Sequence, residues 1–311
     1  MKKLKVFNAC AYPEMIRLYS TTFKERANKP NVLISYFYCT GVANELLALR
    51  DKESLIGELH LDSGAYSVKD GKLCQNDAES ESLLEEYSLD CKLYGKDFDQ
   101  FYSLDDNFNS PEHNFSYFER TMELLKDSPR KVVPVLHAYG EAIIEEFNRY
   151  IDHGCKVVAI GSNVSGISDD TWAKFQAIRN ENSINIHQFG TIEYKRVDVI
   201  NNIRPDSCDS SKFIHAATFG CILHLNPDEV DSETGLCKLD KIYLGDRDNV
   251  PDGTTHFAKY KKKYPKFKEL LKELDLSQGE FLENTSLQHA FNLHAICEIE
   301  KQLNEKIYSK F

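Results

Sequence analysis

Three aspartates follow short apolar segments and are the first candidates for chemistry. Asp62 lies in ELHLDSGAYS, Asp105 in FYSLDDNF and Asp209 in RPDSCDSSKF. In enzymes built on a parallel sheet, the residues just past each strand meet at one edge, where active sites form. A carboxylate there can act as a base, a nucleophile or a hydrogen-bond acceptor. A single aspartate at a strand end is more often a helix N-cap or a turn residue, so both interpretations stay open.

Other polar residues and glycines also follow apolar runs. The segments just past these runs are Asp62-Ser63-Gly64, Asp105-Asp106, His137-Ala138-Tyr139-Gly140, Gly161-Ser162-Asn163, Gly190-Thr191 and Asp209-Ser210-Ser211. Glycines at such positions let a ligand approach the backbone closely. A lone histidine is more often structural than catalytic. The combination of three carboxylates, a histidine and glycine corners is harder to explain as unrelated turns, and a catalytic rim and a set of turns are equally compatible with the pattern alone.

The segments that must position these residues alternate between strand and helix. Predicted strands, rich in Val, Ile, Tyr and Phe, span 31–38, 59–61, 101–104, 131–136, 156–160 and 185–189. Predicted helices span 79–93, 111–125, 141–151 and 170–178. This alternation indicates βα units and a parallel sheet. Strand-like sequence at 221–225 and 241–244 would complete a closed eight-stranded barrel, and no GxGxxG turn supports a dinucleotide-binding fold instead.

The composition shifts after residue 251. We therefore predict a catalytic barrel over 1–251 and a lysine-rich helical extension, packed on the barrel, over 252–311. The extension contains KYKKKYPKFKELLK, and its lysines are Lys259, Lys261, Lys262, Lys263 and Lys266 among others. A solvated surface helix and a phosphate-binding patch are equally compatible with this run.

The net charge and the cysteines restrict the class of protein. With 49 acidic and 38 basic side chains, the formal charge is −11, so the chain has no general attraction for nucleic acid or anionic membranes. A polyanion would have to be held by a local patch. The nine cysteines form no CxxC or CxC pair, which indicates reduced thiols. With no long apolar run, we expect a soluble cytoplasmic protein.

Six short segments together resemble a known family. LDSGAYS, FYSLDD, VVPVLHAYG, VVAIGSN, HQFGTIEY and DSCDSS occur in the order and rough spacing of the motifs of the tRNA-guanine transglycosylase superfamily, which includes the queuine and archaeosine enzymes. The resemblance covers residues 31–213, about 60 per cent of the chain, and its most specific segments are DSGAYS and DSCDSS. It implies a TIM (β/α)8 barrel, in agreement with the alternation of strands and helices.

The resemblance also implies roles for the three aspartates. Asp209 matches the nucleophile that attacks C1′ of the target nucleotide and forms a covalent glycosyl intermediate. Asp62 matches the general acid/base for the leaving and incoming bases. Asp105 matches the carboxylate that reads the N1–H and the exocyclic amine of guanine. An ionised carboxylate is an acceptor-only group and suits two adjacent donors.

The remaining base-binding positions follow in the same way. Tyr66 and Phe189 match residues that sandwich the base, and Gly161 with Ser162 matches the corner that contacts its carbonyl. Ser63, His137 and Gly190 complete the expected pocket.

The sequence departs from the family pattern at several points. His137 stands where the family has a glutamine, and Ala65 and Ser162 replace glycines, which alters the base pocket. The CxCxxC zinc site of the family is absent, and we expect no metal and no cofactor. His289, His294 and Cys297 lie on one predicted helix and are more typical of packing than of metal binding.

These observations favour exchange of guanine in nucleic acid for a 7-deazaguanine such as preQ0. DNA is favoured over tRNA, as in the compact phage-type relatives, because a lysine-rich segment replaces the region that helps the tRNA enzymes hold tRNA. Three alternatives stay open: the same exchange on tRNA, a silent partner subunit of the same fold, and an N-glycoside hydrolase. A homodimer or an accessory protein is compatible with each.

Overall fold

The computed structural model describes residues 3–65, 77–94, 97–105, 110–126, 132–161, 166–190 and 203–310. The chain divides into two compact units. The first unit consists of Met1–Asn31, Ala48–Gly57 and Ser210–Phe311, and the second unit of Val32–Leu47 and Glu58–Asp209. The predicted boundary after residue 251 falls inside the first unit.

The larger sheet is built mainly from the second unit. Its strands are β1 (Lys5–Ala9), β2 (Asn31–Ser35), β3 (Leu59–Asp62), β4 (Gln100–Tyr102), β5 (Val132–Val133), β6 (Val135–Leu136), β7 (Val157–Ile160), β8 (Asn185–Gln188) and β9 (Ser207–Ser210). Their order is β5-β4-β3-β2-β1-β9-β8-β7-β6. Successive pairs from β2 to β5 and from β6 to β9 are parallel. Strands are therefore found in all six predicted segments, but the segment predicted over 31–38 ends as a strand at Ser35, and Tyr36–Cys39 is a short helix.

A single proline explains why the two edges of this order meet. Strands β5 and β6 stand at opposite ends of the order, yet only Pro134 separates them in the chain. The carbonyl of Val133 accepts the N–H of Ser103 on one side, and the carbonyl of Pro134 accepts the N–H of Ala159 on the other. Proline has no N–H and interrupts the ladder without turning the chain away. The sheet is thus a nearly closed parallel barrel of the TIM-like type.

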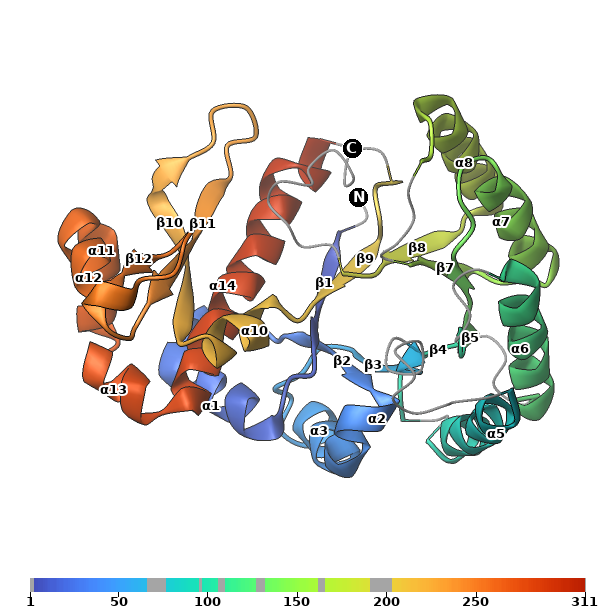
Figure 1. Ribbon diagram of the computed structural model, residues 1–311, viewed down its shortest axis with the longest axis horizontal. Helices are drawn as coiled ribbons and strands as arrows, with labels where there is room; N and C mark the ends of the chain where they lie inside the picture. The colour runs from blue at the N-terminus through green and yellow to red at the C-terminus, as the bar shows by residue number, and fades with distance from the viewer. Residues whose placement is uncertain are drawn as a thin grey trace. The chain divides into compact units, whose positions relative to one another are not determined.

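Helices of the second unit cover the outside of its strands (Figure 1). They are α2 (Tyr36–Cys39), α5 (Asp77–Leu93), α6 (Pro111–Leu124), α7 (Ala142–Asp152) and α8 (Asp169–Asn182). Helix α3 (Ala43–Asp51) begins in the second unit and ends in the first unit. The hydroxyls of Ser110 and Ser168 accept N–H groups in the first turns of α6 and α8. Gly154, with φ +82°, follows the end of α7. These caps confirm the helix boundaries expected from the sequence.

The first unit contains a separate small sheet. Strands β10 (Cys221–Val230) and β11 (Cys237–Tyr243) are antiparallel, and β12 (Thr255–His256) pairs with β11. The prediction that 221–225 and 241–244 complete the barrel is therefore wrong. Only residues 231–236 join β10 to β11, and a parallel crossover needs a dozen residues or more.

The helices of the first unit are α1 (Pro13–Phe23), α10 (Lys212–Thr218), α11 (Phe257–Lys263), α12 (Pro265–Glu273), α13 (Gln278–Glu283) and α14 (Thr285–Lys306). Helices α1, α10 and α13 pack against α14, while α11 and α12 pack against each other and against the small sheet. The buried amide of Asn292 on α14 donates to the carbonyls of Phe213 and Cys221 and accepts the N–H of Leu223. Among the described helices, none is both long enough and apolar enough to cross a membrane.

Candidate functional site

The structure brings the three strand-end aspartates to one rim of the second unit. Asp62 is the last residue of β3, Asp105 lies just past β4, and Asp209 lies in β9. Burial, together with the charges of Asp105 and Asp209, raises the pKa of Asp62 from 3.8 to about 7. Carboxylates influence one another in this way only at short range. Asp62 therefore exchanges its proton near neutral pH, as a general acid/base requires.

A glycine turn fixes the carboxyl group of Asp62. The N–H of Gly64 donates to Oδ2 of Asp62 over 3.2 Å, which is the side-chain turn that the DSG sequence allowed. Gly64 has φ +78°, and a Cβ at this position would overlap the ring of Phe37. The sequence therefore needs glycine here for two independent reasons.

Asp105 is paired with His137. The Nε2 atom of His137 lies 2.5 Å from Oδ2 of Asp105, and each residue is only 6% exposed. On the other oxygen, Oδ1, Asp105 accepts a longer hydrogen bond of 3.5 Å from the hydroxyl of Ser63. One buried hydrogen-bonded group thus contains Ser63, Asp105 and His137. All three residues belong to the pocket that the sequence predicts.

A buried glutamate and a glycine hold His137 in place. Oε2 of Glu146, on α7, accepts the backbone N–H groups of His137 and Ala138 at 3.1 and 2.9 Å. Burial raises the pKa of Glu146, and these two donors oppose the rise. On the opposite side, a Cβ at Gly161 would lie 2.8 Å from Cε1 and Nδ1 of His137. Gly161 therefore leaves room for the imidazole ring, in addition to any contact with a ligand.

Asp209 has its own supports on β8 and just beyond it. The N–H of Gly190 donates to Oδ1 of Asp209 over 2.7 Å. Nε2 of His187 lies 3.7 Å from the same oxygen. Phe189 packs its ring against Tyr102 and His187, with centroids 4.8 Å away in each case. Phe189 and Gly190 therefore belong to the rim, as predicted, and Phe189 offers it an aromatic side chain.

A layer of buried polar rings lies below the rim. Nδ1 of His60 and the hydroxyl of Tyr102 are 3.1 Å apart, and the ring centroids of Tyr102 and His187 are 4.9 Å apart. Burial lowers the pKa of His60 to about 4, so its imidazole is neutral at physiological pH. Interior layers of such barrels usually consist of Val, Ile and Leu. A polar layer at this depth is therefore unusual.

Sequence reasoning missed this layer and Glu146, although both left a signal. His60 lies two residues before Asp62, and His187 lies two residues before Phe189. Because side chains two residues apart in a strand point to the same face, His60 shares a face with Asp62, and His187 shares a face with Phe189. Glu146 lies in the inward stripe of α7 with Ile143, Phe147 and Tyr150. A glutamate at such a position has to find a buried partner.

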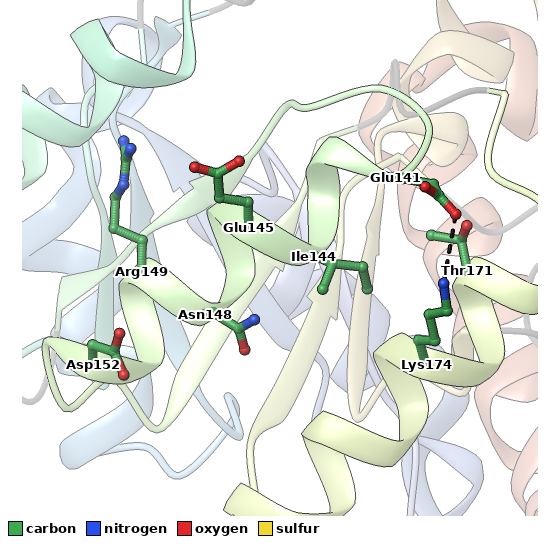
Figure 2. A pocket seen from close by; sticks show the side chains of 8 residues that line it. All are labelled: Glu141, Ile144, Glu145, Asn148, Arg149, Asp152, Thr171 and Lys174. Carbon is green, nitrogen blue, oxygen red and sulfur yellow. Dashed lines mark ion pairs between the residues drawn. The ribbon is translucent and has the colours of Figure 1, made fainter.

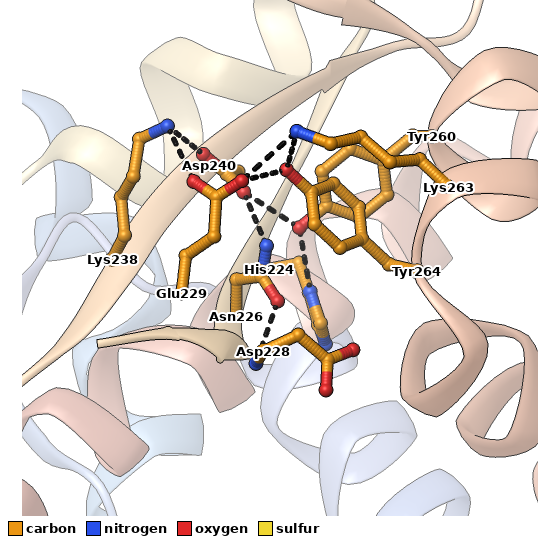
Figure 3. Close-up of polar contacts among 9 residues, drawn as sticks. All are labelled: His224, Asn226, Asp228, Glu229, Lys238, Asp240, Tyr260, Lys263 and Tyr264. Atoms are coloured by element: carbon orange, nitrogen blue, oxygen red, sulfur yellow. Dashed lines mark hydrogen bonds and ion pairs between the residues drawn. The ribbon is translucent and has the colours of Figure 1, made fainter.

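Some predicted residues lie elsewhere. Tyr66 and Ser162 fall outside the described residues. The five lysines lie on α11 and α12 of the first unit, where Lys263 pairs with Glu229 and Lys266 with Asp228, both at 3.0 Å. Figure 3 shows Lys263 and Tyr264 converging on Glu229. Lys259 and Lys262 are exposed and Lys261 is partly buried.

A surface groove on the second unit is distinct from the rim. Figure 2 shows that residues of α7 and α8 line it: Glu141, Ile144, Glu145, Asn148, Arg149, Asp152, Thr171 and Lys174. None of the strand-end residues contributes to this groove, so it does not belong to the candidate site.

On α14, His294 has a packing contact, Cys297 is buried, and burial lowers the pKa of His289. The ring of His294 stacks on Phe23 with centroids 3.9 Å apart, and burial lowers the pKa of His294 to about 4. Cys297 is buried, which raises the pKa of its thiol to about 12. Within the described ranges, no group of three or more His, Cys, Asp or Glu side chains could hold a metal ion.

Comparison with protein-family models and with curated proteins finds no match to this chain.

Proposed function

We propose that the rim formed by Asp62, Asp105 and Asp209 exchanges a guanine base in nucleic acid, with DNA favoured, for a 7-deazaguanine. One observation carries the proposal: a carboxyl group with a pKa of about 7, Asp62, lies within electrostatic range of a second carboxylate, Asp209, whose position is fixed by a backbone N–H. Glycoside chemistry through a covalent intermediate uses two carboxyl groups in this way.

In the first step a carboxylate oxygen of Asp209 forms a bond to C1′ of the target nucleotide. The C1′–N bond to the base breaks, and its electron pair leaves with the base. Asp62 supplies the proton that neutralises the departing base. An oxocarbenium-like transition state is trapped on one face by the carboxylate, which becomes a glycosyl ester.

In the second step an incoming base displaces Asp209. A ring nitrogen of the 7-deazaguanine forms the new bond to C1′, and the ester oxygen of Asp209 leaves with the bonding electrons. Asp62 takes up the proton that this nitrogen loses. The residue that acts as acid in the first step is thus the base in the second, and a pKa near neutrality suits both tasks.

The Asp105–His137 pair supports recognition of a guanine-like edge. Each carboxylate oxygen can accept two hydrogen bonds. His137 uses one position on Oδ2, and Ser63 makes a long contact to Oδ1. An ionised carboxylate is an acceptor-only group that suits two adjacent N–H donors, and Phe189 supplies an aromatic face for a base that has left its stack.

A trapping experiment tests the nucleophile. The protein is incubated with guanine-containing DNA or tRNA and a 7-deazaguanine such as preQ0, and the covalent adduct is isolated under denaturing conditions. We expect an adduct that Asp209→Asn abolishes and that Asp152→Asn, a change at an exposed carboxylate of α7, leaves intact. An adduct that persists in Asp209→Asn would contradict the proposal.

Exchange of radiolabelled guanine decides among the alternatives. Exchange into DNA supports the favoured substrate, and exchange confined to tRNA assigns the same chemistry to tRNA. Steady release of guanine without an incoming base indicates a hydrolase. A chain that forms no adduct and exchanges no base with either polymer is best explained as a silent partner subunit.

A further inference from the structure

His187 is buried in the polar layer directly beneath Asp209. Its exposed fraction is 0%, and its ring contacts those of Tyr102 and Phe189, which also contact each other. Nδ1 of His187 lies 2.9 Å from the hydroxyl of Ser207, and Nε2 lies 3.7 Å from Oδ1 of Asp209. The imidazole thus bridges two positions of β9.

Strand register explains this bridge. His187 and Ser207 are direct partners across β8 and β9. Ser207 and Asp209 are two residues apart in one strand, so their side chains point to the same face. A side chain of imidazole size on the neighbouring strand reaches both of them, and any other register would separate Nε2 from the carboxylate.

The chemistry of the two nitrogens determines where the proton lies. A neutral imidazole has one N–H donor and one acceptor nitrogen. If Nδ1 donated to Ser207, the lone pair of Nε2 would face the oxygen of Asp209, which is unfavourable in a buried site of low dielectric. If the Ser207 hydroxyl donates to Nδ1, Nε2 carries the proton and faces the carboxylate. The second arrangement gives the Ser207 hydroxyl and Nδ1 a hydrogen bond and turns a positive edge of the ring, in place of a lone pair, toward the carboxylate.

On the basis of the function proposed above, we propose that His187 is the positioning residue of the nucleophile. Its Nε2–H and the N–H of Gly190 both point toward Oδ1 of Asp209, which leaves Oδ2 to attack C1′. The Nε2 to Oδ1 distance of 3.7 Å is an electrostatic contact and too long for a hydrogen bond. Contacts of this kind often shorten when substrate binds.

Two donors on one oxygen have a specific effect on the reaction. They fix the rotation of the Asp209 carboxylate about its Cβ–Cγ bond, so Oδ2 is the oxygen that attacks. When the ester forms at Oδ2, the carbonyl oxygen is Oδ1, which keeps both donors. When the incoming base displaces the ester, the same donors stabilise the carboxylate that is released.

A kinetic experiment tests the positioning role. His187→Phe keeps an aromatic ring in contact with Tyr102 and Phe189 and removes both nitrogens. A misplacement of about 1 Å can cost on the order of 100-fold in rate, so we expect adduct formation to slow by about that factor. The KM for the incoming base should change little, because Asp105 and His137 are untouched. His187→Gln, whose amide can donate toward Asp209, should recover part of the rate.

A spectroscopic experiment tests the tautomer without any substrate. Nitrogen NMR of protein labelled in the histidine rings should show that Nε2 of His187 is protonated, with His187→Gln used to assign the signal. Asp209→Asn should shift the Nε2 signal, and Ser207→Ala should shift the Nδ1 signal.

An unprotonated Nε2, or a wild-type rate of adduct formation in folded His187→Phe, would overturn the assignment. If the wild-type protein forms no adduct with either polymer, the proposed function fails. The NMR result then decides by itself whether His187 orients Asp209.

Discussion

Nε2 of His137 lies 2.5 Å from Oδ2 of Asp105, and both side chains are buried. Asp105 therefore does not meet a ligand as an isolated carboxylate. Its charge is paired with the imidazole of His137, and the backbone N–H of His137 donates to Glu146. A buried charge of this kind is costly when its partner is removed, so the two side chains have to be considered as one unit.

Asp105→Asn should weaken base binding more than it weakens the fold. Hydrogen bonds to a charged group contribute about 1.5–3 kcal/mol, so we expect the affinity for guanine to fall by about 10-fold to 100-fold. Calorimetric titration with guanine and urea unfolding measure the two effects separately. His137→Gln keeps a side-chain donor beside Asp105 and serves as the comparison. If Asp105→Asn lowers the free energy of unfolding but leaves the affinity for guanine unchanged, Asp105 is only a turn residue.

Asp62→Asn should change the pH dependence of stability in a defined direction. The carboxyl group has a pKa of about 7 in the folded protein, against an ordinary value of 3.8. Between these values the folded protein holds a proton that the unfolded chain has released, so the free energy of unfolding falls as pH rises from about 4 to 7. The free energy of unfolding of the variant lacks this fall. The difference in free energy of unfolding between variant and wild type should therefore be a few kcal/mol more favourable to the variant at pH 8 than at pH 4.5.

Urea unfolding at the two pH values measures this difference. Asp152→Asn, which also removes one carboxyl group but from an exposed site, is the control. The buried histidines affect wild type and variant alike and cancel in the comparison. A difference between Asp62→Asn and wild type that stays constant with pH would show that Asp62 does not hold a proton near neutrality.

The lysines of α11 and α12 should contribute unequally to binding of nucleic acid. Lys259 and Lys262 are exposed, whereas Lys263 pairs with Glu229. Each phosphate contact that is lost reduces the salt dependence of DNA binding by about 0.9 in log–log slope. We expect Lys259→Ala and Lys262→Ala to reduce the slope and Lys263→Ala to reduce it less. A titration series with increasing salt measures all three, and unchanged slopes would favour a solvated helix.

Tyr260→Phe should destabilise the first unit. The buried hydroxyl of Tyr260 donates to Asp240 over 2.8 Å and lies 3.0 Å from Nδ1 of His224. Burial lowers the pKa of His224 to about 4, so its neutral ring can donate from Nδ1. Loss of the hydroxyl removes a buried partner from both groups, which costs about 1–3 kcal/mol.

Thermal or urea unfolding measures this cost, and Tyr264→Phe is the matched control. The hydroxyl of Tyr264 donates to Glu229, a carboxylate that also binds Lys238 and Lys263 (Figure 3). Glu229 therefore keeps two partners in Tyr264→Phe, and the loss should be smaller. Equal losses in the two variants would show that the His224–Tyr260–Asp240 chain adds nothing beyond a single hydrogen bond.

The barrel was predictable where local patterns determine structure. Alternating strand-like and helical segments identified the βα units between 31 and 189. Strand β9 was not among the predicted strands, because Ser207–Ser210 is polar, yet it pairs with β8 as a strand. The assignment of 221–225 and 241–244 to the barrel failed because pairing partners depend on loop length and tertiary contacts, which strand propensity does not encode.

The rim was predictable because strand ends in a parallel barrel share one edge. Asp62, Asp105, His137 and Asp209 were found in this way. The supports of these residues were not found, because each depends on a contact between two different elements. Glu146 reaches His137 from a helix, and His187 reaches Asp209 through strand register. Neither relationship is visible in a single segment of sequence.

The close approach of Gly161 to His137 restricts how this rim can evolve. Any side chain at position 161 would have to displace the imidazole ring and so break its contact with Asp105. A smaller residue at position 137 removes that obstacle, so the effects of the two substitutions cannot be additive. Changes in base preference at this corner therefore have to pass through paired substitutions, with the change at position 137 coming first.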